Sequence, residues 1–429
     1  MNRRWLIVTT AILLILTILS YSLLLNRTFQ EKLGWHINLW MGRLRTWLNP
    51  PQVVAFSSNG SAGDVEQLAI PSPNVATMTP LPTRQVTQEP TATFAPLPLA
   101  YSIEGGNYFS QHNRWNYCGP ANLAMALSYW GWEGTHDDVA GKVRTYNKDK
   151  NITPGELQAY AEEEAGMGMI IRVGGSLDTL KRIIAAGFPV IVEKGPTFRD
   201  IQYNLTWMGH YQVLSGYNDA QAYFIAQDSY IEPDYHQSYD TLVDEWRSFN
   251  YLYMIVYPPN LENDVLNLLG DDRNEFKNYE KALEKAQQEF YQLSGIQRFY
   301  ALFNYGTNLV KLRDYGGAAK AYDQAFELYD ALPDESIIPY RILWYQTGPF
   351  LAYYYSGRYS DVIEKATKNS IEMVRDNEPA LEESYYWRGM ARIASGEREK
   401  GIDDFYTCLQ YHQGYDPCVE ALNNLGIYP

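Results

Sequence analysis

A proline- and threonine-rich stretch between residues 51 and 100 constrains the fold of this 429-residue chain more than any other feature. Seven prolines lie between Pro71 and Pro98, where they alternate with threonines, and large apolar residues are few. Such a composition cannot bury enough apolar surface to build a core, and it favours an extended, semi-rigid spacer. We therefore predict a linker over residues 51–100 that separates an N-terminal segment from the globular part.

The segment before the linker contains an apolar run long enough to cross a lipid bilayer. Residues 5–25 carry no charged side chain, and as one helix they would span about 30 Å. Arg3 and Arg4 precede the run, as expected on the cytoplasmic side, although cations on its far side weaken this argument. The alternative is a cleaved signal peptide, but no small-residue cleavage motif follows. We predict an uncleaved transmembrane anchor over residues 1–26, with the rest of the chain outside the cytoplasm.

Residues 27–50 show the spacing of an amphipathic helix. The apolar residues that recur at this spacing are Leu33, Ile37, Trp40, Met41, Leu44, Trp47 and Leu48. Tryptophans interleaved with Lys32, Arg43 and Arg45 suit a helix that lies in the membrane interface. A helix packed on the soluble part is the alternative.

Residues 101–259 have a mixed helix and strand pattern. Helices are predicted at 119–130, at 154–165 with Thr153 as its cap, and at 176–186 with Ser176 as its cap. Short apolar runs rich in β-branched and aromatic residues then predict strands at 188–193, 210–217, 222–228 and 251–257. Helices followed by strands are typical of the α+β class.

The strand pattern stops after Pro258-Pro259, and residues 262–429 are predicted to be all helical. Three helix pairs, with turns at 314–315, 357–359 and 396–397, place small and aromatic residues as tetratricopeptide helix pairs do. The region therefore resembles tetratricopeptide repeats with lengthened loops. Such repeats form a concave surface for a protein partner, and stabilising the neighbouring domain is the alternative role.

Charge and cysteine content exclude several classes of function. The formal net charge of -15 argues against nucleic acid as a partner, because phosphate binding needs clustered cations. Three cysteines cannot form a disulfide scaffold, and no cysteine or histidine cluster has zinc-site spacing, so no metal or cofactor is predicted. Cys408 and Cys418 are close enough in sequence to pair in an oxidising compartment, which would leave Cys118 as a free thiol.

Cys118 lies in the stretch "NRWNYCGPANLAMALSYWG", directly before the helix predicted at 119–130. A helix N-terminus stabilises the nucleophilic thiolate through unpaired N–H groups, and proline suits the first helical turn. A buried structural cysteine would have the same surroundings. A catalytic role therefore also requires a base.

His210 is the histidine best placed to be that base, because it begins the alternating run "HYQVLSGY". A hairpin centred on residues 218–221 would pair positions that sum to about 439 and place His210 opposite residue 229. Asp228 would then lie within one residue of His210, where a carboxylate orients the imidazole. An oxyanion donor is also needed, and Gln111, Asn113 and Asn116 lie close enough to Cys118 to supply one.

Three stretches, "FSQHNRWNYCGPANLAMALSYWG", "GHYQVLSGYND" and "FIAQDSY", together resemble a known enzyme family. They are similar to the papain-like cysteine peptidases that process bacteriocin and peptide leaders after a double glycine, and more closely to the stand-alone secreted relatives. The resemblance covers about residues 105–258. It implies Cys118 as nucleophile, His210 as general base and later acid, Asp228 as the orienting residue and Gln111 as oxyanion donor. Gln111 precedes Cys118 by seven positions, more than is usual in the family, so Asn113 stays open as the donor.

The chain departs from the leader-cleaving members of that family, because it has no phosphate-binding loop of an exporting ATPase. We predict a papain-like α+β peptidase domain at 101–259 and a tetratricopeptide-like domain at 262–429, anchored in the cell membrane. The predicted reaction is hydrolysis of a peptide bond in a peptide or protein substrate. A catalytically silent binding protein, and an acyltransferase or cell-wall amidase on the same triad, are the alternatives.

Overall fold

The computed structural model describes residues 96–112, 114, 116–199, 205–332, 339–374 and 377–429, together with Ile37, Trp40, Met41, Leu44, Leu48 and Phe56. The predicted anchor over residues 1–26 lies outside the described residues, as does most of the predicted linker. Within the part of the chain that the structure describes, no helix is both long and apolar enough to cross a membrane. The five described residues between 37 and 48 are all helical, as predicted for that segment.

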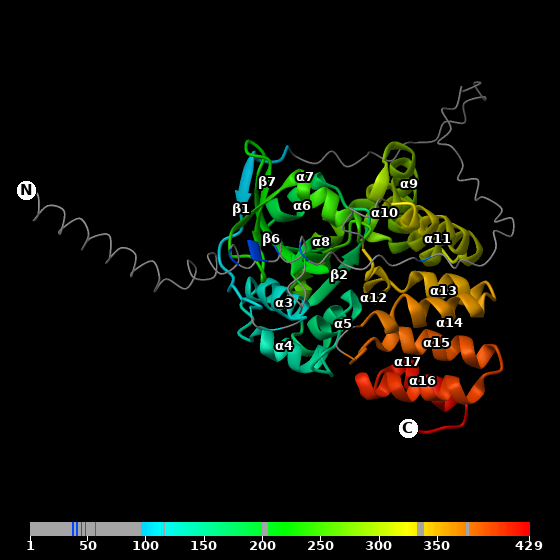
Figure 1. Cartoon of the computed structure of the whole chain (residues 1–429). Coiled ribbons are helices and arrows are strands. Elements are labelled where there is room, and N and C mark those ends of the chain that lie inside the picture. Colours follow the sequence, from blue (N-terminus) through cyan, green and yellow to red (C-terminus); the bar gives the residue numbers. More distant parts are fainter. Residues whose placement is uncertain are drawn as a thin grey trace, which may run out of the picture.

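A seven-stranded antiparallel sheet forms the centre of the first globular part (Figure 1). Its strands lie in the order β2-β9-β3-β6-β7-β8, and β1 pairs with one end of β6. A short ribbon of β4 and β5 stands apart from it. The strands are β1 (Ala100–Ser102), β2 (Gly168–Arg172), β3 (Val190–Lys194), β4 (Thr197–Arg199), β5 (Leu205–Trp207), β6 (His210–Asn218), β7 (Tyr223–Gln227), β8 (Tyr235–Ser238) and β9 (Tyr253–Tyr257).

Helices cover both faces of this sheet, because apolar side chains alternate between its two faces. Ile191 and Val213 face a cluster made with α3, α4 and α5, whereas Val190 and Leu214 face a second cluster made with α6, α7 and α8. These helices are α3 (Cys118–Ser128), α4 (His136–Val143), α5 (Pro154–Ala159), α6 (Leu177–Ala185), α7 (Tyr239–Arg247) and α8 (Glu262–Leu269), and a π-helical turn (Tyr160–Glu164) extends α5.

The predicted helices and strands of this part are confirmed to within a few residues, with Thr153 and Ser176 as helix caps. The sequence did not predict the helices α4 and α7 or the strands β1, β2, β4, β5 and β8. For α7 the sequence did hold a signal, because serine is a preferred N-cap residue and Ser238 directly precedes the helix. In the structure the Ser238 side chain accepts the N–H of Thr241. Strand β8 is mostly polar and exposed, so it lacks the alternation by which strands are recognised.

The rest of the chain is a stack of helices beside the sheet, drawn from olive to red in Figure 1. Three consecutive pairs, α10 with α11, α13 with α14 and α15 with α16, pack against each other and turn where the sequence predicted. The stack comprises α9 (Glu275–Gln292), α10 (Gly295–Lys311), α11 (Tyr315–Asp330), α12 (Ile342–Tyr345), α13 (Gly348–Tyr355), α14 (Tyr359–Lys368), α15 (Glu382–Ala394), α16 (Arg398–Tyr411) and α17 (Asp416–Asn424), with short 3-10 turns at 259–261, 270–273 and 371–373.

Small residues let the helices of a pair approach closely. A Cβ atom on Gly306 would lie 3.0 Å from the Tyr322 ring, and one on Gly389 would lie 2.7 Å from the Phe405 ring. The predicted Cys408–Cys418 disulfide joins α16 to α17 and leaves Cys118 free.

The sheet and the helical stack share one hydrophobic cluster rather than meeting at a wet surface. Trp207 and Phe249 from the sheet side pack with residues of α10 to α13. The Asn250 amide donates to Asn308 over 2.7 Å, and both side chains are buried. Helix α8, which lies in the range predicted as helical repeats, packs in the core cluster of the sheet. The helical stack is therefore in direct contact with the sheet-containing part of the chain, which also holds Cys118 and His210.

Candidate active site

Cys118 is the first residue of α3 and the free thiol of the chain. No side chain caps this helix, and its first turn holds no acidic residue. The N–H groups at the helix start are thus not taken by a capping side chain, and they favour negative charge at the sulfur. Pro120 fits the first turn because a proline there removes no intrahelical hydrogen bond.

His210 and Asp228 form the ion pair that the sequence predicted. His210 is the first residue of β6, Asp228 follows β7 directly, and His210 Nε2 lies 3.0 Å from Asp228 Oδ1. Both residues are buried, with 2% and 0% of their surface exposed. Because Nε2 is engaged with the carboxylate, Nδ1 is the ring nitrogen that is left for the thiol.

The predicted register of the β6–β7 hairpin is wrong, although the pairing of His210 with Asp228 is right. Val213 pairs with Gln227 and Gly216 pairs with Ile225, so paired positions sum to 440 and then 441. The ladder shifts between Leu214 and Gly216, which inserts an extra residue into β6. Asp228 reaches the ring because the chain leaves the ladder after β7 and turns back.

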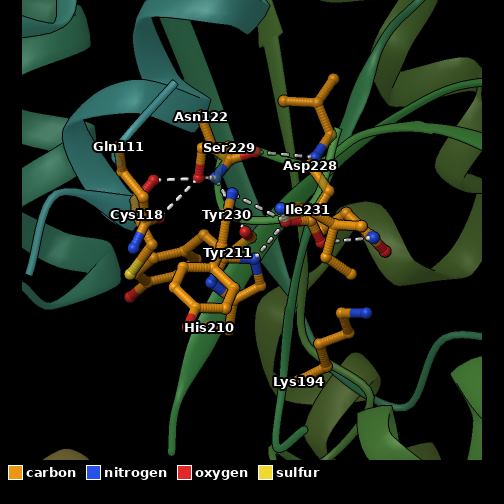
Figure 2. Close-up of polar contacts among 12 residues, drawn as sticks. Gln111, Cys118, Asn122, Lys194, His210, Tyr211, Asp228, Ser229, Tyr230 and Ile231 are labelled. Atoms are coloured by element: carbon orange, nitrogen blue, oxygen red, sulfur yellow. Dashed lines mark hydrogen bonds and ion pairs between the residues drawn. The ribbon is translucent and has the colours of Figure 1, made fainter. Parts of the chain in front are cut away.

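That turn is held by the Asp228 carboxylate. Oδ1 accepts the N–H groups of Tyr230 at 2.9 Å and Ile231 at 3.0 Å, and Oδ2 accepts from Gln212 Nε2 at 2.8 Å. Figure 2 shows Tyr230 and Ile231 beside Asp228. With its lone pairs engaged, the carboxylate keeps one orientation toward His210.

The electrostatics of the pair favour charge on both members. Burial alone would lower the pKa of His210, but Asp228 and the Cys118 thiol outweigh it and raise this pKa to about 9. Burial alone would raise the pKa of Asp228, but His210, Lys194 and the Tyr230 N–H lower it to about 2. The imidazolium is therefore favoured at neutral pH, as a thiolate partner requires.

Asn122 joins the helix of Cys118 to the strand of His210, and sequence reasoning missed it. Its fully buried amide Nδ2 donates to the Cys118 carbonyl at 2.8 Å, the Tyr211 carbonyl at 2.7 Å and Ser229 Oγ at 3.1 Å. Its Oδ1 accepts the Val213 N–H at 3.0 Å. A polar residue on the buried side of an apolar helix is the signal that could have found it.

Gln111 lies beside Cys118 and lines the same cavity (Figure 2). Its N–H donates to the Ser229 carbonyl at 2.8 Å, and its side-chain Oε1 accepts from Ser229 Oγ at 2.7 Å. Because Oε1 is held by Ser229, the amide Nε2 is the end left to donate to an oxyanion. Asn113, the other candidate, lies outside the described residues, whereas Asn116 lines the cavity with its backbone at φ 53°.

The cavity around Cys118 and His210 has a volume of about 60 Å³, which is room for a few water molecules. Besides Cys118, His210 and the residues around them, its walls include the loop 150–152 before α5, Phe198 of the β4–β5 ribbon, the turn before β6 and Tyr345 of α12. Gly209 has no room for a side chain, because a Cβ there would lie 2.9 Å from ring carbons of Tyr345 and Phe249. The helical stack thus contributes directly to the wall of the site.

Two charged residues at the end of β3 were also missed. Glu193 lines the cavity, and burial and the nearby Cys118 sulfur raise its pKa well above the ordinary value. Lys194 is 1% exposed, and its Nζ lies 2.7 Å from Gln237 Oε1 and 3.0 Å from Glu245 Oε2. Charged residues directly after the apolar run "PVIV" were the signal in the sequence.

The other described histidines have separate surroundings. His136 stacks on Phe109, His236 stacks on Tyr223, His112 contacts the Tyr230 carbonyl, and His412 contacts Glu382. Among the described histidines, His210 is the one that lines the cavity with Cys118.

A thiol at a helix start and a histidine held by a buried aspartate on an antiparallel sheet are the arrangement of a cysteine-peptidase-type domain. Residues 104–254 match the Peptidase_C39 like family. A crystal structure whose title describes a C39-like peptidase from Bacillus anthracis matches with 16% identity and a TM-score of 0.29, over 36% of this chain and 97% of that chain. No curated protein matches the chain.

Proposed function

We propose that this protein is a membrane-anchored cysteine peptidase outside the cytoplasm, which hydrolyses a peptide bond through Cys118, His210 and Asp228. The observation that carries the proposal is that His210, paired with buried Asp228 over 3.0 Å, lines one cavity with the free cysteine Cys118. The match of residues 104–254 to the C39-like peptidases supports the same reaction class.

In the proposed reaction the Cys118 thiolate attacks the scissile carbonyl carbon. The carbonyl oxygen becomes an oxyanion, which the Cys118 N–H and Gln111 Nε2 stabilise. As the carbon–nitrogen bond breaks, the His210 imidazolium gives its proton to the leaving amine, and a thioester remains on Cys118. Neutral His210 then takes a proton from water, the hydroxide attacks the thioester, and the acid product leaves with the thiolate restored.

The proposal is tested with the full chain in detergent, a peptide library and mass spectrometry of the products. We expect cleavage by the wild type, none by Cys118→Ala, and a loss of at least 100-fold in His210→Ala. His236→Ala is the matched control, because His236 lies on β8 away from the cavity. Cleavage that survives Cys118→Ala would refute the proposal.

A second candidate is a peptidase fold that binds peptides without cleaving them. The Cys118 cavity is small, and Tyr345 of the helical stack forms part of its wall. A thiol-directed peptide probe separates the two candidates, because a silent protein leaves Cys118 unlabelled while the peptidase is labelled there. Acyl transfer, the third candidate, would instead place the acyl group of a labelled peptide or cell-wall fragment on an added amine.

Two observations support the proposed location. The side chains of Ile37, Trp40, Leu44 and Leu48 are 39–63% exposed on one helical segment, as an interfacial helix requires. The Cys408–Cys418 disulfide suits an oxidising compartment. Alkaline extraction of membranes that leaves the protein in the pellet would support the anchor, and release into the supernatant would refute it.

A further inference from the structure

Phe56 lies in the core of the helical stack, among residues that are far from it in sequence. It belongs to the stretch predicted as a linker, yet only 2% of its surface is exposed. Its ring stacks parallel to Phe326 at 5.0 Å between centroids and meets the edge of Tyr329 at 4.5 Å. Both partners are on α11. An aromatic side chain from the linker region thus completes the core of another domain.

The main chain of Phe56 is held as well as its ring. Its N–H donates to Asp330 Oδ1 at 2.7 Å, and its carbonyl accepts from Lys365 Nζ at 2.8 Å. Asp330 ends α11 and Lys365 lies on α14. Each of these two helices therefore binds one main-chain group of Phe56. Side chains that bind both main-chain groups of a residue are what recognition of a peptide segment requires.

Lys365 is a buried lysine whose ammonium group is hydrogen-bonded to Phe56. Its side chain is nine-tenths buried, with the ammonium 4.4 Å from the Phe326 ring centre. Burial lowers the pKa of Lys365, although nearby Asp323 and Asp361 oppose this shift. A buried ammonium is costly unless it is hydrogen-bonded, and the Phe56 carbonyl supplies such a bond.

We infer that α11 and α14 form a peptide-binding seat for an aromatic residue of a peptide segment, and that Phe56 of the same chain occupies it. Phe326, Tyr329, Asp330 and Lys365 make up this seat. Its ligand is a short peptide with a phenylalanine, bound through the ring and through the N–H and carbonyl of that residue.

Occupation of the seat shortens the tether to the membrane. Residues 51–55 alone separate the seated Phe56 from the end of the predicted interfacial helix, and five residues reach at most about 20 Å. This consequence rests on the proposed anchor. The seat would hold the helical stack close to the bilayer, and the chain after Phe56 would connect it back to the sheet.

A peptide of residues 51–61, PQVVAFSSNGS, tests the seat when it carries a fluorescent label. In the wild-type chain the tethered Phe56 competes at a high effective concentration, whereas Phe56→Ala leaves the seat empty. We expect fluorescence anisotropy to report at least tenfold tighter binding to the full-length Phe56→Ala chain than to the wild type. A peptide with alanine at the Phe56 position should not bind.

Lys365→Met in the Phe56→Ala chain should abolish this binding, and Lys368→Met is its matched control, because Lys368 is an exposed neighbour on α14. Circular dichroism checks that each variant is folded, and Phe56→Leu replaces Phe56→Ala if the latter is not. Equal binding to wild type and Phe56→Ala, or none to either, would overturn the inference. Binding does not use Cys118, so a chain that binds the peptide but cleaves nothing would refute the peptidase proposal alone.

Discussion

At the scale of single residues, the site depends on buried polar side chains whose hydrogen bonds are made by atoms far apart in sequence. Asp228 has partners in β6 and in its own turn, and Asn122 has partners on three segments. Such groups are expensive to leave unpaired in a buried site. Substitutions that keep shape but remove one bond therefore test the site most sharply.

Asp228→Asn is expected to lower activity by about 100-fold to 10000-fold and to change its pH dependence. In the wild type the pKa of His210 is raised to about 9, so activity that needs the imidazolium should fall as pH rises through about 9. Without the carboxylate the imidazolium loses its proton at lower pH, so the alkaline limb of the pH–activity profile should shift to lower pH. The measurement is kcat/KM between pH 5 and 10, with exposed Asp240→Asn as control. An unchanged alkaline limb would contradict the assigned role.

Asn122→Ala is expected to destabilise the fold by about 2–4 kcal/mol, since it leaves the buried Val213 N–H and Tyr211 carbonyl without this partner. The loss also frees α3 to shift against β6, so Cys118 alkylation should slow even where the protein is folded. Urea unfolding gives the free energy, and iodoacetamide gives the reaction rate. A variant as stable as the wild type would show that the amide does not join the two elements.

At the scale of elements, the short helix α12 reaches into a site that the sheet and α3 build. Tyr345 ends α12, lines the cavity, and packs against Trp207 and Phe249 with centroids 5.7 and 5.9 Å apart. The same ring contacts Gly209, the residue directly before His210. The size of the cavity is therefore set in part by the helical stack.

Tyr345→Ala should open the cavity on this side. We expect the ratio of Cys118 alkylation by a bulky naphthyl haloacetamide to alkylation by iodoacetamide to rise about tenfold, because the small reagent already fits. Tyr355→Ala, an exposed tyrosine on α13, is the control. An unchanged ratio would mean that another wall of the cavity limits the access of the bulky reagent to Cys118.

At the scale of the whole molecule, a second contact joins the sheet side to the helical stack around the loop before α5. The Lys150 N–H donates to the Ala380 carbonyl at 3.2 Å, and the Tyr146 hydroxyl donates to Glu378 at 2.8 Å. Asp149 is 2% exposed at this contact, and burial together with Glu382 and Glu156 raises its pKa well above the ordinary value. Residues 150–152 of the same loop line the active-site cavity.

The raised pKa of Asp149 makes stability depend on pH. A carboxyl whose folded-state pKa is raised contributes its full stability below about pH 4, and that contribution is lost as pH rises toward the folded value. Asp149→Asn should therefore raise the midpoint of urea unfolding at pH 8 but not at pH 4. The Oδ1 atom of the introduced asparagine can still accept the Asn151 N–H. Equal shifts at both pH values, or a shift in exposed Asp178→Asn, would refute the explanation.

The sequence by itself determined the longer local elements and pointed to the three residues that matter most to the proposed chemistry. Cys118 was found because a helix start is recognised from neighbouring residues, and His210 with Asp228 because a hairpin pairs residues close in the chain. The disulfide between Cys408 and Cys418 was predictable for the same reason, since the two cysteines are only ten positions apart. Even here the register was missed, because nothing in the alternation reveals the bulge in β6.

Only the tertiary structure decided which distant side chains complete the site. Asn122 contacts Tyr211 across 89 positions, Gln111 contacts Ser229 across 118, and Phe56 contacts Asp330 across 274. Hydrophobic periodicity reports which face of an element is buried, but it carries no information on which other element covers that face. The cavity wall at Tyr345 and the seat for Phe56 therefore emerge only when the helical stack packs against the rest of the chain.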